Sequence, residues 1–244
     1  TSKNEAPESL RGHRAEITGV QVYDFNSPNR LSKEQLRRIE YLHNSFVKRA
    51  SMSLAALFRG SVRLSIKSVE EADYSVFVES IPSPGATFTF AAEPLEGFGI
   101  IDVDINLAFS LIDRLLGGRG EPMSQPRELT TIEQTVAKTI AKTFAREIEW
   151  AWSSLAQLKT SIQAFVVGPE TFQVYGSSTS IVAVEMRLAT DNAEGTVCIG
   201  YPYPMLEPIL REISKAPTFQ RKREPDEKTM TQLLNVVPMT LSAR

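Results

Sequence analysis

The stretch Glu128–Leu155, ELTTIEQTVAKTIAKTFAREIEWAWSSL, predicts a long helix, and its counterpart earlier in the chain sets the plan of the fold. Thr130 or Thr131 is suited to the N-cap, because a threonine hydroxyl can accept a hydrogen bond from a backbone N–H of the first turn. Apolar residues then follow at every fourth position, which indicates one buried face. They are Ile132, Val136, Ile140, Phe144, Ile148 and Trp152.

A segment of the same kind lies earlier in the chain, at 31–59. Ser32 can cap its N-terminus, and Gln35 three residues later can complete a capping box. Its apolar side chains recur at spacings of three and four up to Gly60, which again predicts one buried stripe. They are Leu36, Ile39, Leu42, Phe46, Val47, Ala50, Leu54, Leu57 and Phe58.

Strand patterns follow each long helix. Alternating apolar and polar residues and β-branched runs predict strands, at 61–69, 73–81, 86–92 and 97–105 after the first helix and at 159–168, 177–189 and 194–202 after the second. A short helix ends each series, at 106–116 with Asn106 as its N-cap and at 204–214.

The two series match at one offset. The long helix at 31–59 and the short helix at 106–116 both recur 98 residues later (129 − 31 and 204 − 106). We therefore predict an α/β fold in which a long helix–strands–short helix unit is duplicated, in repeats of about 31–116 and 129–214. Because each unit alone buries its helix stripe poorly, the units should pack as a pseudo-twofold pair. Such a pair would share one antiparallel-rich sheet, with the long helices on one face.

The segments around this core differ from it in composition. Residues 1–22 are polar without periodicity and predict a lead-in segment, so we place the domain at 23–215. Charged, proline-containing residues at 216–232 are typical of a linker. Residues 233–244 predict the truncated start of a further domain. Since the chain also lacks an initiator Met, we expect it to be a fragment of a longer protein.

Charge and residue usage argue against several classes of function. A net charge of −2 and a pI near 5.9 do not favour nucleic-acid binding. No apolar run is long enough to span a membrane, so we expect no direct membrane insertion. The single cysteine, Cys198, cannot form a disulfide within the chain. It predicts a buried, inert thiol in a reducing, cytosolic setting.

Candidate chemistry is sparse. The sequence lacks metal-binding pairs of His or Cys and lacks nucleophile motifs, so we expect no catalytic residue, no metal and no cofactor. Glu40 and His43 lie three residues apart on a helix, where a solvated surface pair is the usual arrangement. Asp102 and Asp104 are spaced for one face and could bind a cation, although such pairs more often simply end a strand.

The stretch LLGGRGEP, Leu115–Pro122, concentrates three glycines in four positions. A phosphate-binding loop precedes a helix, whereas these glycines follow one, where the helix dipole is negative. A helix C-terminus accounts for one glycine, Gly117, but the equivalent helix of the second repeat ends in EISKAPTF without any. We therefore predict a partner-binding turn with a bare backbone and one contact anchor, Arg119. Its contact residues would be Gly117, Gly118, Arg119 and Gly120.

Three segments together resemble the middle domain of the FliM family of flagellar motor switch proteins. They are the entry segment YDFNSPNRLSKEQLRRIEYLHNSFVKRASMSLAALFR (23–59), the turn LIDRLLGGRGEP (111–122) and the helix ELTTIEQTVAKTIAKTF (128–144). The segments occur in the order and spacing typical of the family, and the match extends over about 20–215.

This resemblance implies a CheC-like fold and a non-enzymatic role in the C-ring of the flagellar rotor, in the cytoplasm at the inner face of the cell membrane. The turn Gly117–Gly120 would bind FliG, neighbouring FliM copies would stand side by side, and binding of phosphorylated CheY would be relayed to control rotation direction. FliN would be a further partner. The CheY-binding peptide of the family would lie upstream of residue 1, and the FliN-like domain would begin near residue 233.

One alternative keeps the fold and changes the function. CheC-type phosphatases carry D/S-x-x-E-x-x-N on a helix, and its Glu and Asn can position water on the acyl phosphate of CheY. The corresponding places hold Arg37, Glu40 and His43 in the first long helix, with Asn44 one residue out of phase, and Thr130, Glu133 and Val136 in the second. Neither helix has the amide in place, so we expect no phosphatase activity.

Overall fold

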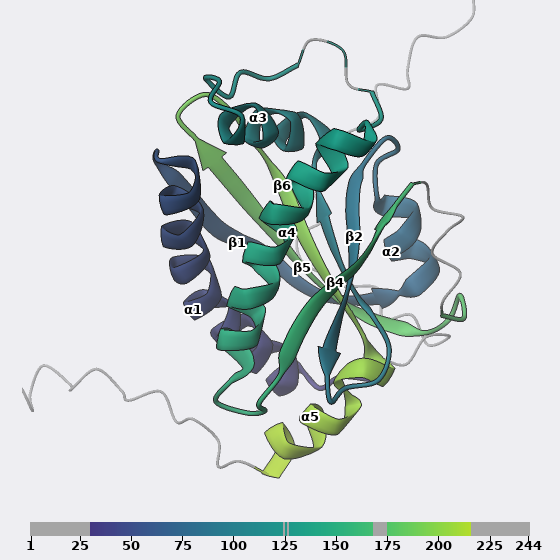
Figure 1. The fold of residues 1–244 in the computed structure, drawn as a ribbon. Coiled ribbons are helices and arrows are strands. Elements are labelled where there is room, and N and C mark those ends of the chain that lie inside the picture. Colours follow the sequence, from purple (N-terminus) through teal and green to yellow (C-terminus); the bar gives the residue numbers. More distant parts are fainter. Residues whose placement is uncertain (1–29, 124, 126, 168–174, 216–244) are drawn as a thin grey trace, which may run out of the picture.

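The computed structural model describes residues 30–123, 125, 127–167 and 175–215. Within these residues, six antiparallel strands form one sheet in the order β1-β5-β6-β3-β2-β4 (Figure 1). They are β1 (Val62–Asp73), β2 (Ala86–Glu93), β3 (Gly99–Val103), β4 (Lys159–Val166), β5 (Ser180–Thr190) and β6 (Glu194–Pro202). The predicted lead-in segment 1–22, linker 216–232 and further domain 233–244 lie outside the described residues.

The strand order confirms the predicted duplication. β3 and β6 pair at the centre of the sheet, and each half places its first strand at the edge of the other half, because β1 pairs with β5 and β4 pairs with β2. If each strand is replaced by its counterpart in the other half, the strand order reads the same from the opposite edge of the sheet. Ile101 of β3 lies opposite Ile199 of β6, 98 residues later, so the pseudo-twofold axis passes near this pair.

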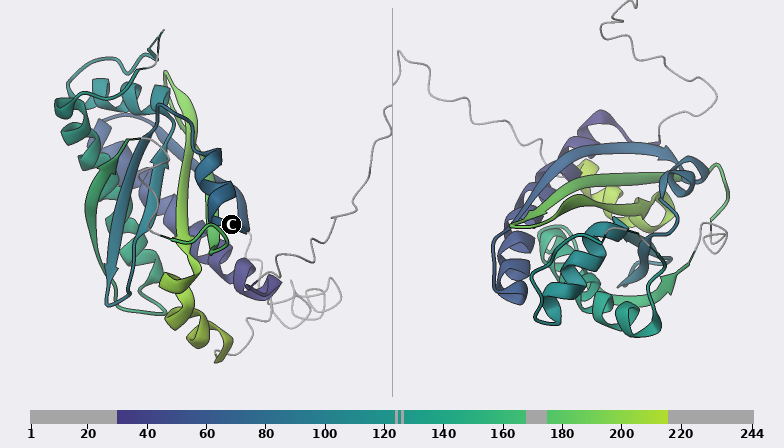
Figure 2. Two further views of the ribbon diagram at one scale, coloured as in Figure 1. Left: turned by 90° about the vertical axis from the view of Figure 1, so that its right-hand side faces the viewer. Right: turned by 90° about the horizontal axis from the view of Figure 1, so that it is seen from above.

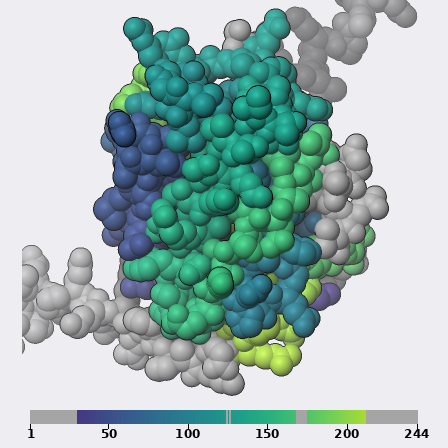
Figure 3. Space-filling model, viewed as in Figure 1, coloured from purple at the N-terminus to yellow at the C-terminus, as the bar shows by residue number. Residues whose placement is uncertain are grey.

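Two long helices, α1 (Lys33–Phe58) and α4 (Thr131–Trp152), cover one face of the sheet, as predicted (Figures 1 and 3). They meet at equivalent positions. Phe46 and Phe144 stack with ring centroids 6.2 Å apart, and Arg49 Nε donates to Glu147 Oε2 at 2.9 Å. Both pairs are separated by 98 residues, so the axis that relates the strands also relates the helices.

The helix starts follow the local sequence. The predicted capping box is present at Ser32 with Gln35, and Thr130, one of the two predicted caps of α4, forms a second capping box with Glu133. The short helices are α3 (Ile105–Leu115) and α5 (Tyr203–Lys215). The predicted cap of α3 was wrong: Asp104 Oδ1, not Asn106, accepts from Leu107 N at 3.0 Å. The helix begins one residue earlier than expected, which places Asn106 inside the first turn.

The strand predicted at 73–81 is a helix, α2 (Tyr74–Ser80). Its Tyr74 and Phe77 are spaced by three residues, so both can face one side of a helical turn, and both are buried. They join Ile100 and Ile181, whose strand neighbours Ile101 and Val182 belong to the main core. Because successive strand residues point to opposite faces, α2 packs on the face away from α1 and α4 (Figure 2).

The predicted stripe of α4 is buried except at its start. Ile140, Phe144, Ile148 and Trp152 are at most 3% exposed, whereas Val136 is half-buried and Ile132 is 76% exposed. Four residues advance an α-helix by about 40° beyond a full turn, so a stripe at strict spacing of four winds around the helix. The prediction that Ile132 lies on the buried face is therefore wrong.

Candidate functional site

The turn after α3 closes the helix with a full set of backbone hydrogen bonds. Gly118 N donates to Asp113 O at 2.8 Å and Gly117 N donates to Arg114 O at 3.1 Å, which is the pattern of a Schellman motif. Gly117 has φ of 94°, in the left-handed region, and no atom outside its chain neighbours lies within 4 Å of the place where a Cβ would stand. Gly117 is therefore needed for its backbone conformation and not for lack of space.

The other two glycines have local reasons as well. A Cβ at Gly118 would overlap the Asp113 carboxylate, whose Oδ2 accepts from Gly120 N at 2.8 Å. Gly120 has φ of 74° and is buried, and a Cβ there would overlap the side chain of Arg114. The prediction that the helix end explains only one glycine is thus wrong.

These contacts leave a small exposed surface. Gly117, Gly118 and Arg119 are exposed, whereas Gly120 faces the Arg114 stem. Leu116, at the C-cap of α3, is 68% exposed. Leu116 is not among the predicted contact residues. An apolar residue directly before a helix-ending glycine, outside the apolar face of the helix, is a sequence signal that could identify it. The turn therefore presents one cation and one apolar side chain beside bare backbone.

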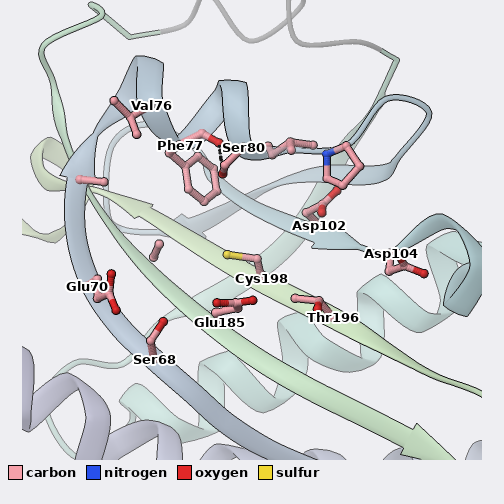
Figure 4. Close-up of a pocket in the computed structure, with 14 residues that line it drawn as sticks. Ser68, Glu70, Val76, Phe77, Ser80, Asp102, Asp104, Glu185, Thr196 and Cys198 are labelled. Carbon is pink, nitrogen blue, oxygen red and sulfur yellow. Dashed lines mark hydrogen bonds between the residues drawn. The ribbon is translucent and has the colours of Figure 1, made fainter. Parts of the chain in front are cut away.

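A pocket of about 400 Å³ lies on the α2 side of the sheet (Figure 4). Glu185, Cys198 and Asp102 form a row across its floor, because they are register partners on β5, β6 and β3. Asp102 Oδ1 accepts from Thr87 Oγ1 at 2.6 Å, and burial raises the pKa of Asp102 to about 6. Asp104, the other member of the predicted pair, caps α3. Both carboxylates therefore have structural partners.

Cys198 is half-buried at the pocket and not fully buried as predicted. Burial, together with the nearby Asp102 and Glu185 carboxylates, raises its pKa to about 12, so the thiol stays protonated at neutral pH. Since the thiolate is the reactive form, this agrees with the prediction of an inert cysteine. In the part of the chain that the structure describes, no group of three His, Cys, Asp or Glu side chains is placed to hold a metal ion.

His43 is not the surface residue that the sequence predicts. It is fully buried on α1, with Nδ1 2.8 Å from Ile39 O and Nε2 2.9 Å from the hydroxyl of Tyr201. Desolvation lowers its pKa to about 4, so the ring is neutral. Glu40, three residues earlier, is exposed, and the two do not form a solvated pair. The apolar spacing of α1 already includes position 43, which is one turn from Ile39 and Phe46.

The alternative phosphatase arrangement gains no support from these positions. Glu133 is engaged in the cap of α4, where it accepts from Thr130 N at 2.7 Å and from both Nη atoms of Arg127 at 2.8 Å. These bonds, with the Arg127 bond contributing most, lower the pKa of Glu133 to about 2. In α1 the place of the catalytic amide is held by the buried His43, and the Asn44 amide donates to Glu40 O at 3.1 Å.

None of the helices among residues 30–123, 127–167 and 175–215 combines the length and apolarity that a membrane crossing requires.

A family model described as flagellar motor switch protein FliM matches residues 32–218. Flagellar motor switch proteins FliM from Treponema pallidum and Borreliella burgdorferi are 30% and 33% identical to the chain, over 91% and 85% of its length. The chain spans only 64% and 60% of these two relatives.

A solved structure of similar fold is the FliG–FliM complex from H. pylori. Its matching chain is 29% identical and superposes with a TM-score of 0.72, over 74% of the present chain and 100% of its own length. The fold is therefore similar to that of a chain crystallised in a FliG–FliM complex.

Proposed function

The chain belongs to the family of the flagellar motor switch protein FliM, and from that premise we propose that it is a non-enzymatic component of the bacterial flagellar motor switch. In this role the turn Gly117–Gly120 binds FliG. The observation that carries the proposal is the turn itself: its backbone is held by hydrogen bonds to Asp113, and Arg119 and Leu116 project beside it. A related chain of the same fold occurs in a FliG–FliM complex.

A preformed turn suits a contact of this kind. Because the backbone is already ordered in the free protein, binding requires little further loss of conformational entropy. Arginine is enriched among the residues that contribute most to protein interfaces, whereas leucine is under-represented there, so Arg119 is the expected anchor and Leu116 adds apolar contact area. We assign the contact to Gly117, Gly118, Arg119 and the side chain of Leu116, with Gly120 shaping the turn from beneath.

The remaining partners follow from the same membership. Copies of the chain stand side by side in the C-ring, FliN is a neighbour, and binding of phosphorylated CheY is relayed through the domain to FliG and thus to rotation direction. The setting is the cytoplasm, at the basal body on the inner face of the cell membrane. A relay of this type requires a rigid-body change of the domain, which one continuous sheet under two long helices can transmit.

The test is a binding titration of FliG against the chain and its Arg119→Glu variant. Charge reversal at an exposed anchor should weaken binding about tenfold or more, equivalent to roughly 1.4 kcal/mol, without changing the melting temperature. Arg119 is preferred to Gly118 for this purpose, because a side chain at 118 would displace the Asp113 carboxylate and disturb the turn.

Arg37→Glu is the matched control. Arg37 is exposed near the start of α1. The turn lies near the other end of this helix, because the guanidinium of Arg114 reaches Gly60, just after α1 ends. At ~1.5 Å per residue the two sites are about 30 Å apart. Equal affinity of the Arg119→Glu variant and wild type, or equal weakening by both variants, would contradict the proposed site.

A further inference from the structure

We propose that the β5–β6 hairpin of the second half holds the partner-binding turn of the first half in place, with Asn192 and Asp191 as its positioning residues. The inference rests on the proposed function for its effect on FliG, and on the structure alone for its effect on the turn. It assigns a role to a hairpin that lies in a different repeat, more than seventy residues along the chain from the turn.

The hairpin and the turn lie side by side at the top of Figure 1, and two contacts join them. Asn192 Nδ2 donates to the backbone oxygen of Arg119 at 2.6 Å. Asp191 Oδ2 lies 3.5 Å from Nη1 of Arg114, an ion pair without a hydrogen bond at that nitrogen. The stem of the same Arg114 lies over Gly120. The hairpin therefore reaches the turn directly at residue 119 and indirectly at residue 120.

A turn of this composition needs such support. Glycine loses more backbone freedom on ordering than other residues, and Arg119 stands between two glycines. Asp113 fixes the turn from the α3 side by accepting from Gly118 N and Gly120 N. The Arg119 oxygen and the Gly120 N–H belong to one peptide unit, so Asp113 holds this peptide at its N–H and the Asn192 amide holds it at its oxygen.

The hairpin is itself well ordered. Thr190 N donates to Ala193 O at 2.8 Å, and Ala193 N donates to Thr190 Oγ1 at 3.1 Å, which closes a tight connection around Asp191 and Asn192. Its strands lie between β1, at the edge of the sheet, and β3, near the centre of the sheet. The turn is thus tied to the sheet of both halves, so a movement of β5 and β6 would be passed to the Arg119 peptide.

The test uses the Asn192→Asp and Asn192→Ala variants of the whole chain. Asp keeps the shape of Asn but replaces the donor with a carboxylate that faces the Arg119 carbonyl, and Ala removes the group. Glu194→Gln is the control, because Glu194 is exposed on the same hairpin and pairs with Arg187, away from the turn. Two quantities are measured: hydrogen exchange of the Gly118 and Gly120 amides in the free chain, and affinity for FliG.

We expect both Asn192 variants to exchange these two amides several-fold faster than wild type, with core amides unchanged, and to bind FliG on the order of tenfold more weakly. The control should match wild type in both measurements. Unchanged exchange at Gly118 and Gly120 would overturn the inference, even if FliG binding fell, because that pattern describes direct contact. Faster exchange with unchanged FliG affinity would support the role of the hairpin in holding the turn and would contradict the turn as the FliG contact. If wild type fails to bind FliG, the proposed function is wrong, while the exchange measurement still decides whether the hairpin holds the turn.

Discussion

At the residue scale, the glycines of the turn differ in what they require. Gly117 needs only a left-handed backbone, with open space around its Cα. Gly120 needs the same backbone and also lies under the Arg114 side chain. Gly118 keeps clear of the Asp113 carboxylate, which accepts a hydrogen bond from Gly120 N. A single motif thus combines conformational and steric reasons for glycine, and only mutation can separate them.

We expect Gly117→Ala to lower the free energy of unfolding by about 1 kcal/mol, the usual difference for a non-glycine residue in the left-handed region. Gly120→Ala should lower it by roughly 2–3 kcal/mol, because overlap with the Arg114 stem adds to the same backbone strain. Urea unfolding of the two variants and wild type measures the difference. A loss for Gly120→Ala no greater than that for Gly117→Ala would show that Arg114 moves aside freely.

At the element scale, the contact between α1 and α4 carries an ion pair near the pseudo-twofold axis. Glu147 is 1% exposed and accepts from Arg49 Nε at 2.9 Å and from Ser53 Oγ at 2.7 Å. The side chain of Arg49 is 40% exposed, and its guanidinium carbon lies 4.2 Å from the ring centroid of Trp150. In an exact duplication, equivalent positions on the two helices would carry the same residue and would face each other. Positions 49 and 147 instead carry opposite charges and form an ion pair.

Removing Arg49 alone should therefore leave a buried carboxylate without its strongest partner. We expect Arg49→Leu to lower the free energy of unfolding by about 2 kcal/mol, less than for a fully buried pair because the arginine is partly solvated. The double variant Arg49→Leu/Glu147→Leu should recover most of that loss, since two apolar side chains can pack between the helices. Urea unfolding of Arg49→Leu, of Glu147→Leu, of the double variant and of wild type forms a double-mutant cycle. Additive losses would mean that the two residues do not interact.

The long helices and their caps are predictable from sequence because the signals are local. Ser32 forms the expected capping box with Gln35, and Thr130 is the N-cap of α4, as one of the two expected caps. The helix α2, which stands where a strand is predicted at 73–81, could not be found from such local signals. Its β-branched and aromatic residues favour a strand, but the burial of Tyr74 and Phe77 against the far face of the sheet favours a helical turn, and this tertiary contact prevails.

The candidate site shows the same division. A glycine turn that follows a helix can be located from sequence, and so can the exposed Arg119 within it. The Asp113 contact to Gly120 and the Asn192 contact to Arg119 cannot, because they depend on the turn conformation and on a hairpin that is distant in sequence. His43 is missed because a titratable side chain predicts exposure, whereas its hydrogen bond to Tyr201 satisfies the ring in the core.

At the scale of the whole molecule, two buried titratable groups on opposite faces of the sheet affect stability with opposite sign. His43, on the helix side, has its pKa lowered from 6.5 to about 4 by desolvation. Between these values the unfolded chain binds a proton that the folded chain does not, so stability rises with pH. Asp102, on the α2 side, has its pKa raised from 3.8 to about 6 by burial, with Asp104 adding to it and Thr87 opposing it. Here the folded chain holds the extra proton, so stability falls as pH rises.

Each shift corresponds to roughly 3 kcal/mol across its window, and the windows nearly coincide. We therefore expect the two contributions to offset each other in wild type between pH 4 and pH 6.5. Asp102→Asn keeps the acceptor for Thr87 and removes the titration, so the free energy of unfolding of this variant should fall by about 2–3 kcal/mol on acidification from pH 6.5 to 4.

His43→Gln should behave in the opposite way and become less stable as pH rises from 4 to 6. Urea unfolding at fixed ionic strength measures both slopes. Parallel pH profiles for the two variants would show that these groups do not control the acid response, whereas slopes of opposite sign would identify them as an offsetting pair across one sheet.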